Sequence, residues 1–113
     1  MKRVYDAPSR TDGVRVLVDR LWPRGLTKER AAVDEWLKEQ SPSAELRKWF
    51  GHEPDKWPDF QKRYKKELAA QKDALKSLRK MGKDRTVTLL FGARDTEHNE
   101  AVVLKRVLER GNR

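Results

Sequence analysis

The sequence contains no cysteine. Disulfide bonds, thiolate nucleophiles and cysteine-based zinc sites are therefore excluded, and the absence of thiols fits a reducing compartment. The first ten residues, MKRVYDAPSR, lack the apolar stretch of a signal peptide. No run approaches the ~20 apolar residues that a membrane helix needs. We therefore expect a cytoplasmic protein that has no membrane partner.

Common cofactor motifs are missing as well. The two histidines, His52 and His98, lie far apart and show no metal-ligand spacing, so we expect no metal site, with magnesium held by carboxylates as the alternative. The glycine-rich loops that cradle nucleotides are absent, and no serine stands in the strand-to-helix elbow of a hydrolase. The sequence therefore leaves any cofactor unknown.

Charge, in contrast, is abundant. Charged residues make up 40% of the 113 residues and hydrophobic residues 36%, so a core requires a regular apolar pattern. The runs VRVLV and VTLLF supply that pattern, which a disordered chain would lack. The net charge is +9, and residues 54–85 hold 11 Lys or Arg against 5 Asp or Glu. Such a basic segment attracts nucleic acid or forms a solvated lysine-rich helix face.

Strands are expected where aliphatic and β-branched residues alternate or run together between turn residues. The expected strands cover residues 3–5, 14–19 and 86–91. Within the second of these, Val16 and Val18 face one side of the sheet and Leu17 faces the other. Residues 32–39 fit either a helix or a short edge strand, and we favour the strand.

Helices are expected between these strands. Thr27 is suited to cap a short helical turn, and Ser43 to cap a helix over 44–50 that Gly51 ends.

Apolar residues at helical spacing continue over 57–81, where Gln71 interrupts the stripe, so this region is either one bent helix or two helices, closed by Gly82. A last helix is expected from about Thr96 to Arg110, with Asp95 or Thr96 as its cap.

Strands separated by helices require crossover connections, which are typical of parallel α/β sheets. We therefore predict one compact domain over residues 1–113. Its fold class is α/β: a small, mostly parallel sheet of three or four strands flanked by helices in a three-layer, Rossmann-like arrangement.

Open α/β sheets bind ligands outside the carboxyl ends of their strands. Two polar segments, 19–25 and 94–99, follow expected strands and converge if those strands are neighbours. Arg20, Arg24 and Arg94 would clamp a phosphate or carboxylate with forked hydrogen bonds. A small anionic ligand is therefore the expected partner.

Proton transfer at this site would fall to residues of the same two segments. His98 titrates near neutrality, and Asp95 or Asp19 could act as a base or orient a hydroxyl. His52 could reach the same pocket, although a helix-terminal histidine more often bonds a carbonyl. The structural alternative is that these charges form ion pairs that only hold two loops together.

Three long motifs resemble the YeaO-like family, domain of unknown function 488: DGVRVLVDRLWPRGL, DEWLKE followed by ELRKWFGH, and TVTLLFGARD followed by EHNEAVVL. The resemblance extends from Arg3 to about Leu108 and implies a compact three-layer α/β domain. The polar positions that it shares with the family are Asp19, Arg20, Arg24, His52, Arg94, Asp95, His98 and Asn99. Gly92 is a departure, because similar proteins more often carry alanine or tyrosine there. The resemblance implies no particular reaction.

Three functions fit the sequence. The first is an enzyme or binding protein for a small phosphate- or carboxylate-bearing ligand at the strand ends, and we favour it. The second is a nucleic-acid-binding module that uses residues 54–85. The third is a structural or adaptor domain. The sequence does not indicate an oligomeric state.

Overall fold

The computed structural model describes residues 1–110. Its four strands form one sheet in the order β1 (Lys2–Arg3), β4 (Val87–Phe91), β2 (Val14–Leu17) and β3 (Glu35–Trp36). Every neighbouring pair is parallel, which confirms the predicted sheet. The uncertain segment 32–39 supplies the edge strand β3, as favoured from the sequence.

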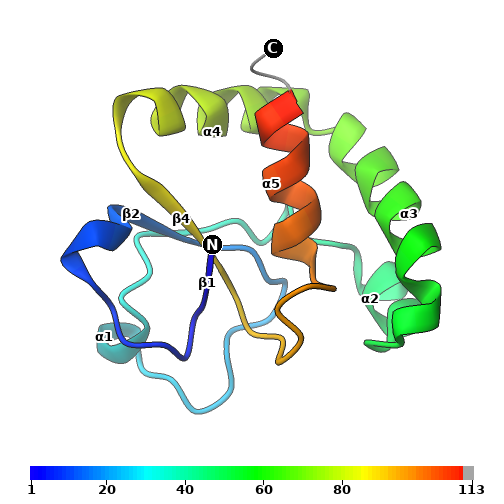
Figure 1. The fold of residues 1–113 in the computed structure, drawn as a ribbon, viewed down its shortest axis with the longest axis horizontal. Helices are drawn as coiled ribbons and strands as arrows, with labels where there is room; N and C mark the ends of the chain where they lie inside the picture. The colour runs from blue at the N-terminus through cyan, green and yellow to red at the C-terminus, as the bar shows by residue number, and fades with distance from the viewer. Residues whose placement is uncertain (111–113) are drawn as a thin grey trace.

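The helices are α1 (Lys28–Ala31), α2 (Ala44–Phe50), α3 (Trp57–Ala69), α4 (Lys72–Asp84) and α5 (Glu100–Arg110), with 3-10 turns η1 (Arg10–Asp12) and η2 (Pro54–Lys56). In Figure 1, α1 lies alone at the lower left, away from α2, α3 and α5. None of these helices is long and apolar enough to cross a membrane.

The two faces of the sheet are covered unequally. Val16 and Val18 of the β2 segment belong to a large core that α2, α3, α4 and α5 complete. Leu17 faces the other way, into a small cluster with Val4, Leu90 and Ala31 of α1. The alternation predicted along this strand is confirmed, and the second face is covered by one short helix and loops.

Local capping explains most element ends. The Thr27 hydroxyl accepts the Arg30 N–H, and the Ser43 hydroxyl accepts the Leu46 N–H, so both predicted caps are present. Gly51 ends α2 with a φ of 53°, a left-handed conformation that glycine adopts without strain. The break between α3 and α4 falls at Gln71, so residues 57–81 belong to two helices.

Two expected helix boundaries were wrong. Gly82 does not close α4, which continues to Asp84. No atom of residues 1–110 within 4 Å requires a glycine at this position, and a single glycine inside a helix weakens the helix without ending it. The last helix begins at Glu100 instead of near residue 96. Asn99 caps it, since the Asn99 side-chain oxygen accepts the Val102 N–H at 3.2 Å.

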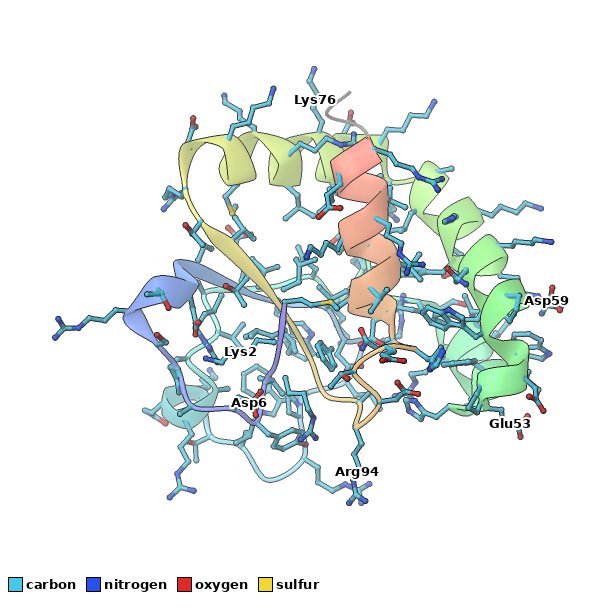
Figure 2. The ribbon with its side chains drawn as sticks, in the orientation of Figure 1. Lys2, Asp6, Glu53, Asp59, Lys76 and Arg94 are labelled. Atoms are coloured by element: carbon cyan, nitrogen blue, oxygen red, sulfur yellow. The ribbon has the colours of Figure 1, made fainter. Side chains whose placement is uncertain are left out.

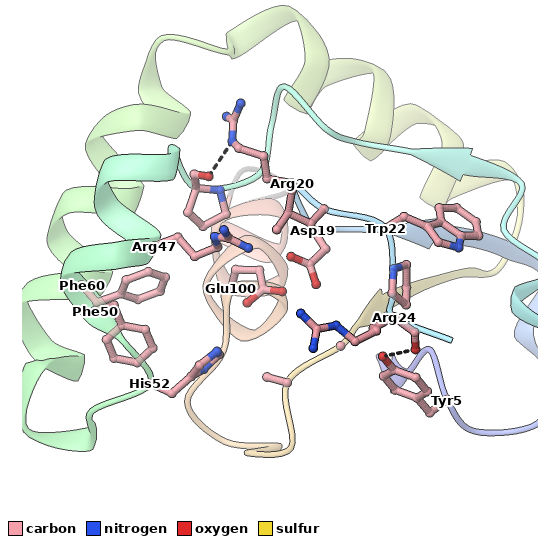
Figure 3. Close-up of a pocket in the computed structure, with 15 residues that line it drawn as sticks. Tyr5, Asp19, Arg20, Trp22, Arg24, Arg47, Phe50, His52, Phe60 and Glu100 are labelled. Carbon is pink, nitrogen blue, oxygen red and sulfur yellow. Dashed lines mark hydrogen bonds between the residues drawn. The ribbon is translucent and has the colours of Figure 1, made fainter. Parts of the chain in front are cut away.

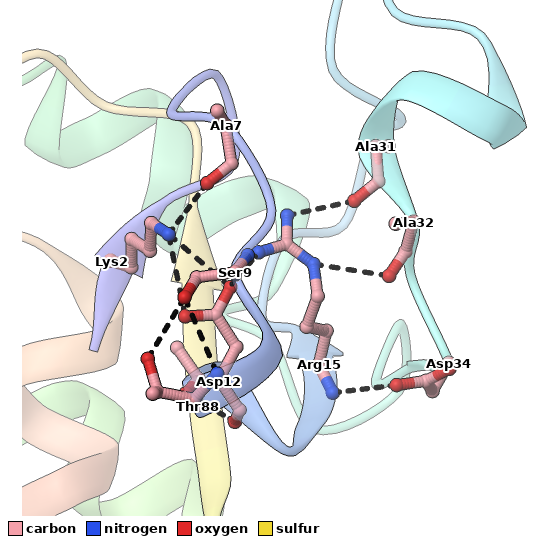
Figure 4. Close-up of polar contacts among 10 residues, drawn as sticks. Lys2, Ala7, Ser9, Asp12, Arg15, Ala31, Ala32, Asp34 and Thr88 are labelled. Carbon is pink, nitrogen blue, oxygen red and sulfur yellow. Dashed lines mark hydrogen bonds and ion pairs between the residues drawn. The ribbon is translucent and has the colours of Figure 1, made fainter.

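A buried charged cluster closes the amino end of the sheet; we call Lys2, Asp12 and Arg15 the Arg15 cluster (Figure 4). The Arg15 guanidinium bonds the Asp12 carboxylate at 2.6 Å and the carbonyls of Ala31 and Ala32 at 2.8 and 3.1 Å. Lys2 adds a second ion pair to Asp12 at 3.2 Å. The cluster thereby ties the N-terminal segment and α1 to β2.

Candidate functional site

A pocket of about 260 Å³ lies at the carboxyl ends of β2 and β4, next to the start of α5. We call it the strand-end pocket (Figure 3). Its acidic, basic and histidine lining residues are Asp19, Arg20, Arg24, Arg47, His52 and Glu100. The remaining lining residues are Tyr5, Leu21, Trp22, Pro23, Pro42, Phe50, Phe60, Gly92 and Ala93. The pocket lies at the edge of the sheet where the sequence predicted a site.

Asp19 enters the pocket directly from the end of β2. Burial raises the pKa of its carboxyl above the usual range, against the opposing charges of Arg47 and His52 and the backbone N–H groups of Arg20 and Gly92. Gly92 lies so close that a Cβ added there would be 3.1 Å from Asp19 Oδ2. The carboxylate is therefore held against the end of β4.

Glu100, the first residue of α5, is the second carboxyl of the pocket. Burial, followed by the negative charge of Asp19, raises its pKa to about 8. At neutral pH Glu100 therefore carries a proton for most of the time, and it presents a hydrogen-bond donor as well as an acceptor. Two carboxyls in one confined site resist double ionisation, and Glu100, whose pKa is raised further, takes up the proton.

Arg47 and Arg24 bring positive charge to these carboxyls from two different elements. Arg47 projects from α2 and Arg24 from the loop after β2, and Figure 3 shows both guanidiniums directed toward the centre of the pocket. Within residues 1–110, neither guanidinium forms a hydrogen bond or an ion pair. Their donors are free to receive a ligand.

The position of Arg47 depends on how α2 is anchored. At the start of α2, the Ser43 N–H and hydroxyl donate to the two carboxylate oxygens of Glu67 in α3, at 2.8 and 2.7 Å. The buried Tyr64 hydroxyl donates to the Gln40 carbonyl at 2.7 Å, just before α2. These bonds fix α2 against α3 and hold Arg47 at the pocket.

Arg20 lines the pocket but its head group is engaged elsewhere. Its guanidinium donates to the carbonyls of Pro42 and Ser41 at 2.9 and 3.2 Å. Arg20 therefore connects the end of β2 to the turn before α2, and two of its three donor nitrogens are used in that connection.

His52 lies at the opposite side of the pocket, just after α2. Its backbone has a φ of 57°, unusual for a residue with a side chain, and its ring lies 5.9 Å from the Phe50 ring. Of the two alternatives considered for His52, the structure places its side chain at the pocket.

The segment 94–99 does not line the strand-end pocket. Arg94 extends into solvent (Figure 2). The Asp95 carboxylate accepts the backbone N–H groups of Glu97 and His98 and bonds His98 Nδ1 at 2.9 Å, and these bonds lower its pKa. The His98 ring makes an edge contact with Trp57 at 5.2 Å.

Asn99 is buried and serves as the cap of α5, with its side-chain nitrogen donating to the Asp95 carbonyl at 2.9 Å. The predicted convergence of the two polar segments is therefore not seen at the pocket. Of residues 92–100, only Gly92, Ala93 and Glu100 line it, while the Asp95 carboxylate bonds Glu97 and His98 of its own loop.

Sequence reasoning missed Arg47, Glu100 and Tyr5. The first two stand inside motifs that carried the family resemblance, ELRKWFGH and EHNEAVVL. Arg47 lies on the polar side of a short amphipathic helix, where arginines are usually solvated. Glu100 was missed because the helix was expected to start about four residues earlier, which places Glu100 inside the helix and not at its first position.

The arrangement favours an anion. With Glu100 protonated, the guanidiniums of Arg24 and Arg47 outnumber the ionised Asp19, which leaves an excess of positive charge. No group of three or more His, Cys, Asp or Glu within residues 1–110 has the arrangement of a metal site. The residues that line the pocket supply charge pairing and hydrogen bonding, with Asp19 and Glu100 able to hold or exchange a proton.

Comparisons with known proteins agree with the resemblance. Residues 1–112 match the model of a family described as the inactive DUF488-N3 subclade. The uncharacterised protein YeaO of Escherichia coli is 48% identical over 103 residues, covering 91% of this chain and 90% of its own length. Uncharacterised proteins of Mycobacterium bovis and Mycobacterium tuberculosis are 41% identical over 106 residues, covering 94% of this chain and 89% of their own. No solved structure matches.

Proposed function

The chain belongs to the YeaO-like DUF488 proteins, in the subclade described as inactive, and we propose that it binds a small organic anion in the strand-end pocket. The observation that carries this proposal is the pair of guanidiniums, Arg24 and Arg47, that face the pocket without a partner among residues 1–110. Guanidiniums hold phosphate or carboxylate groups with paired, charge-assisted hydrogen bonds. A protonated Glu100 adds a donor for the same ligand.

Binding is favoured over turnover. The subclade's description as inactive supports this choice, and so does the position of the Asp95–His98 pair, whose bonds fix a loop outside the pocket. If the ligand is transformed, Asp19 with Glu100 is the pair that would move the proton, because both side chains line the pocket.

Thermal denaturation in the presence of sulfate, phosphate and small carboxylates tests the proposal. An anion at about 100 times its dissociation constant should add about 2.7 kcal/mol of stability. Arg47→Gln and Arg24→Gln should abolish this gain. Arg94→Gln is the matched control, since Arg94 extends into solvent outside the pocket, and it should leave the gain unchanged. Absence of any gain, or the same loss in all three variants, would refute an anion site here.

A second candidate function is nucleic-acid binding, which the exposed lysines of α3 and α4 favour. Lys62, Lys66 and Lys72 are exposed, and Figure 2 shows Lys76 pointing away from the body of the protein. Affinity for an oligonucleotide should then fall steeply with salt and be lost when Lys62, Lys65, Lys66 and Lys72 are changed to Gln, while Arg47→Gln has little effect. The opposite pattern supports the pocket.

A further inference from the structure

The strand-end pocket has an apolar rim that an inorganic anion does not explain. The large hydrophobic side chains most exposed within residues 1–110 are Met1, Tyr5, Leu21 and Trp36. Tyr5 and Leu21, 42% and 53% exposed, line the pocket, and Trp36, 39% exposed, packs edge-on against the pocket residue Trp22 at 5.5 Å. Exposed apolar surface that gathers beside a polar pocket marks a place where a ligand covers it.

The rim is also bonded to the loop that follows β2. Each of its three aromatic side chains donates a hydrogen bond to a backbone carbonyl of residues 19–26: Tyr5 Oη to Arg24 at 3.1 Å, Trp22 Nε1 to Leu26 at 2.8 Å and Trp36 Nε1 to Asp19 at 2.6 Å. These bonds use only the polar edge of each aromatic group. The Arg3 guanidinium lies 5.1 Å from the centroid of the Tyr5 ring, and the Lys38 ammonium lies 5.4 Å from that of Trp36. Even with these cations in place, 42% of Tyr5 and 39% of Trp36 remain exposed, and a ligand could cover this apolar surface.

The size of the pocket sets a limit on the ligand. A single oxyanion such as phosphate occupies roughly the volume of two water molecules, about 60 Å³. The pocket volume of about 260 Å³ is several times larger, but it lies just below the range usual for drug-sized ligands. The ligand should therefore be an anion attached to one further group of modest size.

The arrangement of charged and aromatic groups indicates what that group is. Tyr5 is bonded to the backbone of Arg24, so a phosphate held by the Arg24 side chain places the rest of the molecule near the rim. Asp19 and Glu100 lie in the same pocket and can hydrogen-bond hydroxyl groups, Asp19 as an acceptor and the protonated Glu100 as an acceptor or a donor, as acidic residues do with ribose. A flat heteroaromatic ring stacks on exposed aromatic surface.

We propose that the ligand of the strand-end pocket is a phosphate ester that carries a sugar and a flat heteroaromatic ring, that is, a nucleoside monophosphate, free or at the end of a nucleic-acid chain. This inference rests on the proposed anion binding and specifies its substrate class. Arg24 and Arg47 hold the phosphate, Asp19 and Glu100 the sugar hydroxyls, and the rim of Tyr5 and Trp22 the ring.

The test measures dissociation constants by titration calorimetry for inorganic phosphate, ribose 5-phosphate, adenosine and adenosine 5′-monophosphate. The monophosphate should bind about tenfold more tightly than ribose 5-phosphate, because stacking on one aromatic ring commonly contributes a factor of this size. Adenosine, which lacks the anion, should bind more weakly than the monophosphate. Equal affinity for adenosine 5′-monophosphate and ribose 5-phosphate overturns the nucleotide assignment and leaves anion binding intact.

Failure of the underlying anion site has a different signature. If neither inorganic phosphate nor ribose 5-phosphate binds, the phosphate-ester assignment fails, and the proposed function fails with it when sulfate and small carboxylates give no thermal stabilisation either. If adenosine binds as tightly as its monophosphate, the arginines have no part in recognition, and both proposals fail.

Two variants of Tyr5 separate stacking from loop support. Tyr5→Phe removes the hydrogen bond to Arg24 and keeps the ring, whereas Tyr5→Leu removes both. The preference for the monophosphate over ribose 5-phosphate should survive in Tyr5→Phe and fall toward one in Tyr5→Leu, while the two variants bind ribose 5-phosphate equally. Equal preferences in both variants would show that the Tyr5 ring takes no part and would overturn the rim assignment.

Short oligonucleotides with and without a 5′-phosphate identify the source of the ligand. Binding of the phosphorylated form at least as tightly as the free monophosphate assigns the site to chain ends, and weaker binding assigns it to free nucleotides; either result supports the inference. Equal binding of both oligonucleotides, unaffected by Arg47→Gln, would instead assign recognition to the lysines of α3 and α4 and overturn the inference.

Discussion

Arginines and carboxyls lie at both ends of the sheet, but within residues 1–110 they are paired with one another at the amino end and unpaired at the carboxyl end. At the amino end, the Arg15 cluster is closed: Arg15 and Asp12, with side chains 5% and 8% exposed, pair at 2.6 Å, and every donor group of the arginine has a partner. At the carboxyl end, Arg24 and Arg47 face Asp19 and Glu100 across an open pocket, without a bond between them.

The pKa values show the same contrast. The N–H of Ser9, assisted by Arg15 and Lys2, lowers the pKa of Asp12, whereas burial raises the pKa of Asp19 and of Glu100. A carboxyl whose pKa falls on folding stabilises the folded state as an ion, and one whose pKa rises is kept at a cost. The amino end therefore stabilises the fold, whereas the carboxyl end keeps charged groups at a cost, which supports the ligand site proposed there.

The largest effect should come from removing the closed arginine. Arg15→Met leaves Asp12 and the carbonyls of Ala31 and Ala32 without their partner, and the melting temperature should fall by more than about 10 °C. The matched variant Arg47→Met, at the open end, should change it by less than about 2 °C, because no bond is lost. Thermal unfolding followed by circular dichroism compares the two. Equal losses would contradict the division between a structural end and a ligand-binding end.

Glu100 should impose a pH dependence on stability. Its carboxyl ionises near 4.5 when unfolded and near 8 when folded, so between these values the folded state holds a proton that the unfolded state has lost. The contribution of Glu100 to stability should therefore fall as pH rises from 4.5 to 8, by up to about 1.4 kcal/mol per pH unit. Glu100→Gln should remove this slope and be more stable than wild type at pH 8.

Urea unfolding at pH 5, 6, 7 and 8 measures the difference between wild type and Glu100→Gln. The exposed Glu97→Gln is the control and should follow the wild-type curve. Parallel curves for wild type and Glu100→Gln would show that Glu100 titrates normally, and the contrast between the two ends would then rest on geometry alone.

The sequence predicted the sheet because strand patterns and helix caps are local signals. Thr27, Ser43 and Gly51 each determine an element boundary through bonds to residues no more than four positions away. The end of α4 and the start of α5 could not be predicted this way. Asp95 can cap a helix or close a turn with similar bonds, and here its bonds to the N–H groups of Glu97 and His98 close a turn that precedes α5.

The site was predicted where it depends on strand ends and missed where it depends on helix packing. Asp19 and Arg24 follow β2 directly, so the position of the strand was sufficient to place them. Arg47 reaches the pocket only because Glu67 anchors α2 to α3, a contact across 24 positions of sequence. Arg20 was predicted as a ligand donor, and its bonds to Ser41 and Pro42 emerge only from the folded chain.

Anion binding should itself depend on pH through Glu100. Above pH 8 the carboxyl ionises and repels an anion, so the affinity for sulfate, which does not titrate in this range, should fall roughly tenfold between pH 7 and pH 9. Glu100→Gln should bind sulfate with an affinity that is nearly constant over the same interval. Calorimetric titration at both pH values checks this, and an identical decline in the variant would exclude Glu100 as its cause.

The smallest effect is expected for Gly92→Ala, a substitution that changes the shape of the pocket at the carboxyl end of the sheet and leaves all its charged residues in place. A Cβ at this position lies 3.1 Å from Asp19 Oδ2, so Gly92→Ala should displace the carboxylate by a few tenths of an ångström. The melting temperature should change by less than about 2 °C, since the end of a flexible side chain can yield. Sulfate affinity should change by a factor of about two to three, equivalent to about half a kcal/mol.

Gly82→Ala is the control for this substitution. It adds a methyl group in α4, where nothing lies within 4 Å, and should stabilise the helix by up to about 1 kcal/mol without altering sulfate binding. A change in melting temperature for Gly92→Ala as large as that for Arg15→Met would mean that the carboxyl end also maintains the fold. Its open charges would then need an explanation other than a ligand, because a site kept for binding tolerates small displacements that a closed cluster does not.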